Sequence, residues 1–88
     1  MQTKEKITLM SKILRELDDV ISSQTSVLKK IAQIEADNIN LNDSSLADQL
    51  PDIHEHVDAA LVTTTDLHAK FKEVHDDFVA NNPIQEEA

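Results

Sequence analysis

Residues 7–34 read ITLMSKILRELDDVISSQTSVLKKIAQI, and apolar side chains recur in this stretch at seven-residue intervals. The repeat has a first column (Ile7, Leu14, Ile21, Leu28), a second column (Met10, Leu17, Gln24, Ile31) and a third column (Ile13, Val20, Val27, Ile34). A helix with a two-column seam needs one partner, whereas a stripe of three columns is too wide for one neighbouring helix to cover. The stretch therefore predicts a long helix that packs inside a helical bundle.

Composition restricts the rest of the fold. The 88 residues include no glycine, no cysteine and two prolines, Pro51 and Pro83. Strand-rich folds draw on glycine for tight turns, and phosphate-cradling loops and nucleophile elbows need it as well. Without cysteine, neither a disulfide nor a thiolate metal site can reinforce so small a chain. We therefore expect an all-α protein that is stabilised by helix packing and by association.

Charge is distributed unevenly. The net charge is −9, and residues 37–88 hold twelve acidic residues against the two lysines Lys70 and Lys72. A surface of this sign repels nucleic-acid backbones and anionic membranes, which argues against direct binding to either. No apolar run reaches the length of a signal peptide or of a membrane span, so the expected location is the cytoplasm.

The predicted organisation is a single helical-hairpin domain, 1–82, followed by a flexible tail, 83–88. The first helix is expected over about 4–36 with Thr3 as its N-cap, the connector over about 37–50, and the second helix over about 51–80. Pro51 either starts the second helix or bends one that begins near Ser45, and we expect a break or bend there. The connector's apolar side chains are expected to pack over the end of the bundle; they are Ile39, Leu41, Leu46 and Leu50.

The second helix has a heptad seam of its own, formed by Ile53, Val57, Ala60, Thr64, Leu67, Phe71, Val74 and Phe78. In an antiparallel hairpin, residues that meet have numbers with a constant sum. A sum of 88 aligns the two seams and pairs their polar members, Gln24 and Thr64. This pair is a candidate buried polar layer, which could fix register and oligomeric state. The alternative is that both side chains lie at a solvated edge of the bundle.

The second helix can cover only part of the three-column stripe, so the third column is predicted to be the partner surface. The preferred solution is a second copy that completes a four-helix bundle dimer, with Leu61 and His68 joining Ile13, Val20, Val27 and Ile34 at the interface. A helix of another protein could occupy the same groove, and the connector's leucines could instead fold back over it and permit a monomer.

Four histidines invite a chemical interpretation. Three of them, His54, His68 and His75, share the heptad position beside the second seam and could form a titrating stripe, although edge residues without a special role explain them as well. His54 and Asp58 could supply two metal ligands, but no Glu-x-x-His motif of a di-iron bundle occurs. Two long helices offer little enclosed volume for catalysis. We therefore predict no catalytic residue, no metal and no cofactor.

The function expected from these patterns is that of a non-enzymatic interaction module, a self-associating hairpin that serves as an assembly, adaptor or chaperone component. A different function would use the acidic face of the second helix to imitate nucleic acid and block a DNA- or RNA-binding protein. The residues of that face are Asp58, Asp66, Glu73, Asp76 and Asp77. A metal-binding helical bundle is a further alternative.

Overall fold

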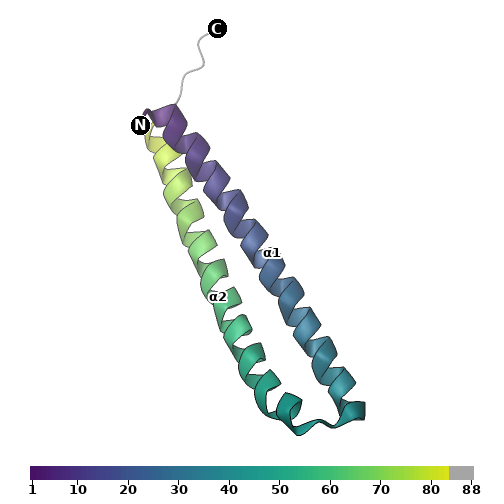
Figure 1. Cartoon of the computed structure of the whole chain (residues 1–88). Helices are drawn as coiled ribbons and strands as arrows, with labels where there is room; N and C mark the ends of the chain where they lie inside the picture. The colour runs from purple at the N-terminus through teal and green to yellow at the C-terminus, as the bar shows by residue number, and fades with distance from the viewer. Residues whose placement is uncertain (84–88) are drawn as a thin grey trace.

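A computed structural model describes residues 1–83 as an antiparallel hairpin of two helices (Figure 1). Helix α1 spans Thr3–Leu41 and helix α2 spans Ser44–Asn81, and no strand occurs among the described residues. The two helices lie side by side, and the molecule measures 67 × 20 × 17 Å. The prediction of an all-α helical hairpin is confirmed. Most of the predicted flexible tail, residues 84–88, lies outside the described residues.

Helix α1 is longer than predicted at its C-terminal end, because it continues to Leu41 rather than to about residue 36. Asn42 follows in the left-handed conformation (φ 57°, ψ 44°), and its N–H donates to the carbonyl of Asn38 at 2.6 Å. Asparagine tolerates this conformation better than most residues other than glycine, so it ends the helix in a chain without glycine. At the other end the cap is Gln2, without a side-chain hydrogen bond, and Thr3 is already helical.

The connection between the helices is much shorter than the predicted connector of 37–50. Only Asn42 and Asp43 separate α1 from α2. The side chain of Asn38 holds this turn from within α1, since its Nδ2 donates to the Asp43 carbonyl (3.1 Å) and its Oδ1 accepts from the Asp43 N–H (2.9 Å). The asparagine-rich segment thus closes the turn while most of it remains helical.

Helix α2 begins at Ser44 and passes through Pro51 without interruption, which corrects the expected start near residue 51. Asp43 is the N-cap, because its carboxylate accepts from the Leu46 N–H at 3.0 Å and from the Ser45 hydroxyl. These hydrogen bonds, with that from Ser45 the stronger influence, hold the pKa of Asp43 below its ordinary value. Pro51 cannot donate a backbone hydrogen bond, and the stabilising cap of the first turn offsets part of the stability that is lost for this reason.

The core between the helices is thin. Among residues 1–83, only Met10, Ile31 and Leu50 are buried hydrophobic residues, and no side chain is fully enclosed. Of the connector residues expected to cover the end of the bundle, Leu50 is buried and Leu46 half-buried. Ile39 and Leu41 instead project into solvent, with 80% and 70% of their surface exposed. No segment of the described chain therefore folds back over the third column.

The register agrees with the predicted antiparallel pairing to within a few residues. Polar contacts join His75 to Ser11 and His68 to Asp18, pairs whose numbers add to 86, and His54 to Glu35, which add to 89. The predicted sum of 88 lies between these values. An error of a whole heptad, which would move the sum by seven, is excluded.

Candidate interaction surface

The third column of α1 lies open along the hairpin. Val20, Val27 and Ile34 are exposed over 43%, 47% and 38% of their surface, and Ile13 is half-buried. The first and second columns are instead half-buried or buried from Ile7 to Ile31. Helix α2 therefore covers two of the three apolar columns of α1.

Helix α2 is rotated about its axis relative to the predicted seam. Val57, Thr64, Phe71 and Phe78 are half-buried as expected, but the alternate members of the seam are exposed. Those exposed members form a fourth column, Ile53, Ala60, Leu67 and Val74. The histidine column, His54, His68 and His75 together with Leu61, takes their place against α1 and is half-buried. The predicted seam of α2 was thus right in one of its columns and wrong in the other.

The third and fourth columns lie on the same face of the hairpin. A helix turns by about 100° per residue, so Ile13, two positions after Ser11, projects from the opposite flank of α1. On α2, Leu67 likewise lies about 100° from His68, across the line of Val57 and Phe71. Contacts of His75 with Ser11 and of His68 with Asp18 mark one edge of the helix pair. Both exposed columns therefore lie on the opposite side of the helix pair from these contacts. Together we call the two columns the apolar face.

The side of the hairpin opposite the apolar face is polar, and contacts between side chains of α1 and α2 hold the two helices together there. His54 Nδ1 lies 2.8 Å from Glu35 Oε1, and His68 Nε2 lies 3.3 Å from Asp18 Oδ1. A carboxylate only accepts hydrogen bonds, so the ring N–H of His54 donates to Glu35. These contacts give a physical reason for the rotation of α2, because α1 offers acceptors to the imidazoles at this edge. We call the side of the hairpin that carries these contacts the histidine edge.

His75 has the most complete set of partners on this edge. Its Nδ1 lies 3.0 Å from Asp76 Oδ1 and its Nε2 lies 3.1 Å from Ser11 Oγ. Because the carboxylate can only accept, Nδ1 carries the proton, and Nε2 of the neutral ring then accepts from the Ser11 hydroxyl. Asp76 also accepts from Lys72 Nζ at 2.8 Å. The Lys72 hydrogen bond, and secondarily that from His75, lowers the pKa of Asp76.

The predicted polar layer occupies the seam, but its two members do not form a mutual hydrogen bond. Gln24 and Thr64 are both half-buried, and the Thr64 hydroxyl donates to the carbonyl of Ala60 in its own helix at 2.8 Å. Gln24 Oε1 is shielded from solvent and has no hydrogen-bond partner among the described residues. An unpaired buried acceptor costs about 1–3 kcal/mol, so this layer weakens the hairpin locally.

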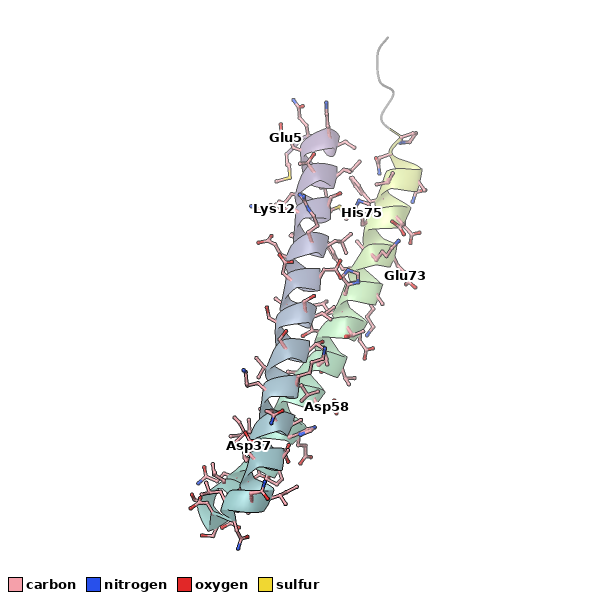
Figure 2. All side chains as sticks on the ribbon, turned by 90° about the vertical axis from the view of Figure 1, so that its right-hand side faces the viewer. Glu5, Lys12, Asp37, Asp58, Glu73 and His75 are labelled. Atoms are coloured by element: carbon pink, nitrogen blue, oxygen red, sulfur yellow. The ribbon has the colours of Figure 1, made fainter. Side chains whose placement is uncertain are left out.

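The remaining predicted surface residues form two groups, one in the column that faces α1 and one that is exposed on α2. Leu61 and His68, expected at an oligomer interface, are half-buried in the column that faces α1. All five acids of the predicted acidic face are exposed, and Figure 2 shows Glu73 on the outer side of α2 and His75 on its inner side. Lys72 pairs with Asp76 inside this face, and the Asp76 hydrogen bond raises the pKa of Lys72.

Among residues 1–83, no three histidine or acidic side chains come together as a group that could hold a metal ion. Neither α1 nor α2 has a stretch long and apolar enough to cross a membrane.

Sequence reasoning missed the α1 partners of the histidines and the role of Asn38. Ser11 and Asp18 are seven residues apart, as are His68 and His75, and this shared spacing is the signal that could have found them. The predicted alignment placed Ile13, rather than Ser11, opposite His75, because two apolar seams were matched first. In comparisons with known proteins, no family model, no curated protein and no solved structure matches the chain.

Proposed function

We propose that this protein is a non-enzymatic interaction module that pairs with a second copy of itself through the apolar face, forming a four-helix bundle dimer. In this role it would serve as an assembly, adaptor or chaperone component. The observation that carries the proposal is the continuity of the apolar face over both helices. A face built from two helices fits another helix pair, which is the arrangement of a four-helix bundle.

The thin core of the hairpin supports the same proposal. A two-helix hairpin buries one side of each helix, and the three buried hydrophobic residues of the described part, 1–83, are few for a chain near the lower size limit of independent folding. Burying the open half of an aliphatic side chain contributes about 1 kcal/mol, and each copy presents at least six such side chains. The largest exposed fractions among them are those of Leu67 (51%) and Val74 (53%).

The size of the apolar face is also adequate. From Ile13 to Ile34 a helix rises about 32 Å, and the hairpin is 20 Å wide. The projected area is therefore about 600 Å², and the accessible area is larger because the side chains form ridges. Stable protein interfaces bury roughly 800 Å² on each partner. The face is thus of the order that a stable dimer needs.

The test is the mass in solution of the wild type and of a double variant, Val20→Lys with Val27→Lys. The wild type is expected at twice the chain mass of 9.9 kDa, and the variant at 9.9 kDa with its helical circular dichroism retained. Both valines are exposed in the single hairpin, so lysine there leaves the contact between α1 and α2 intact.

Val62→Lys is the matched control. Val62 is 55% exposed on α2 but lies outside the apolar face, so its replacement should leave the dimer unchanged. A wild type that has the mass of one chain, or a double variant that keeps the mass of the wild type, would refute the proposal.

A further inference from the structure

We infer that the two copies associate in an antiparallel orientation, with the turn of each hairpin beside the open end of its partner. This inference rests on the proposed dimer and adds the orientation in which the second copy docks. It depends on how charge is distributed along the length of the hairpin.

The half of the hairpin that contains the turn is strongly acidic. Residues 34–62 carry seven acids and neither lysine nor arginine; the acids are Glu35, Asp37, Asp43, Asp48, Asp52, Glu55 and Asp58. This half therefore has a charge of −7 with neutral histidines. Residues 1–20 and 66–83, which meet at the open end, carry eight acids and six basic residues and have a charge of −2.

The basic residues of the open end lie on both helices, namely Lys4, Lys6, Lys12, Arg15, Lys70 and Lys72. Lys6 reaches across the helix pair at this end, and its Nζ lies 4.6 Å from the centre of the Phe78 ring. In a parallel dimer the two turn halves, each of −7, would lie together. In an antiparallel dimer each lies beside the partner's open end and its cations. Like charges within about 10 Å repel at ordinary ionic strength, so charge favours the antiparallel orientation.

The apolar face accommodates this orientation because its two columns share one centre. The third column is centred midway between Val20 and Val27, and the fourth midway between Ala60 and Leu67. Those centres, at positions 23.5 and 63.5, have a sum of 87. Residues that meet across the hairpin have numbers with sums of 86 to 89, so the two centres lie at the same height along the hairpin. A single two-fold axis at that height therefore brings both columns into register with their own copies.

In this orientation each column meets its own copy in the partner. Val20 meets the partner's Val27, and Leu67 meets the partner's Ala60, so that a large side chain lies against a small one. The amide oxygen of Gln24, which has no hydrogen-bond partner among the described residues, lies at the height of the axis. Apolar packing alone would also permit a parallel dimer, in which Val20 meets the partner's Leu67, and the charge distribution therefore decides the orientation.

Distances between spin labels on the intact dimer test the inference. The natural chain has no cysteine, so Asn40→Cys labels a single exposed site near the turn. In the antiparallel dimer the two labels are about 50 Å apart along the bundle, because each lies 16.5 residues from the axis at about 1.5 Å per residue. In the parallel dimer both labels lie at one end, within about 30 Å.

Thr63→Cys provides the matched control, because it lies close to the height of the axis and gives a short distance in either orientation. A short distance at residue 63 with about 50 Å at residue 40 supports the inference. Short distances at both sites would overturn the antiparallel orientation while leaving the dimer intact. The absence of any coupling at residue 63, with the mass of a single chain, would overturn the proposed dimer and the orientation together.

Discussion

The Nε2 atom of His75 lies 3.1 Å from the Oγ atom of Ser11, although 64 positions separate the two residues in the sequence. This contact joins the C-terminal part of α2 to the N-terminal part of α1, at the end of the hairpin remote from the turn. His75 also bonds to Asp76, and Asp76 accepts a hydrogen bond from Lys72, so a network of hydrogen bonds continues along α2. A polar network at the open end therefore complements the turn in fixing which residues of the two helices meet.

We expect Ser11 and His75 to be energetically coupled. In a double-mutant cycle of Ser11→Ala and His75→Ala, the coupling free energy should be about 0.5–1.5 kcal/mol, because each single variant removes the same hydrogen bond. Urea unfolding at one fixed protein concentration measures it, since association makes apparent stability depend on concentration. The cycle of Ser11→Ala with His56→Ala is the control, because His56 is exposed and should add independently. Strictly additive effects of Ser11 and His75 would show that the contact contributes nothing.

Asn38 is expected to contribute more to stability than its place in a polar segment suggests. Its side chain is buried, with 9% of the residue exposed, and it makes two hydrogen bonds to the backbone of Asp43. Asn38→Ala should lower the free energy of unfolding by about 1–3 kcal/mol, because the Asp43 N–H is left without its partner. Asn40→Ala, two positions away and exposed, should change it by less than about 0.5 kcal/mol. Equal effects of the two substitutions in thermal or urea unfolding would contradict this role.

The asparagines also show where sequence reasoning reached its limit. Residues 37–42 predicted the end of a helix, because Asn and Asp compete with helical hydrogen bonds. In the structure the helix continues to Leu41, because the Asn38 side chain bonds to Asp43 in the turn beyond the helix while the backbone of Asn38 stays helical. Whether such a side chain ends a helix or closes the turn after it depends on the position of α2, which local propensity does not contain.

The rotation of α2 has a similar cause. Apolar periodicity predicted the existence, direction and approximate register of both helices, and it identified the third column as surplus to the hairpin. Periodicity could not decide which flank of the α2 stripe faces α1, because Phe71 and Val57 belong to the packed face in either case. The choice depends on polar contacts of His68 with Asp18 and of His75 with Ser11, and polar side chains carry no weight in a hydrophobic pattern.

The N-cap of α2 should make stability depend on pH in the acid range. The pKa of Asp43 is lowered in the folded protein by hydrogen bonds from Ser45 and Leu46, so its contribution is present above the ordinary value of 3.8. That contribution is lost as the pH falls through the lower, folded-state pKa, because the unfolded state takes up the proton first. Asp43→Asn keeps a side-chain acceptor without the charge. Its thermal stability should be lower than that of the wild type at pH 7, and the difference should diminish towards pH 2. A difference that stays constant over this range would contradict the assignment of Asp43 as a charged cap.

Pro51 is expected to limit the stability of α2. It is the eighth residue of a helix that runs without interruption from Ser44 to Asn81, and it has no N–H to donate to the carbonyl four residues earlier, that of Ala47. Proline in a helix interior is about 3 kcal/mol less favourable than alanine, and its restriction of the unfolded chain returns about 0.4–1 kcal/mol. Pro51→Ala should therefore raise the free energy of unfolding by about 2 kcal/mol in urea titrations at fixed protein concentration. Pro83→Ala is the control, because Pro83 follows the end of α2 and interrupts no helical hydrogen bond. If Pro51→Ala proved no more stable than Pro83→Ala, the proline would have to stabilise the start of α2 as much as it disturbs the backbone there.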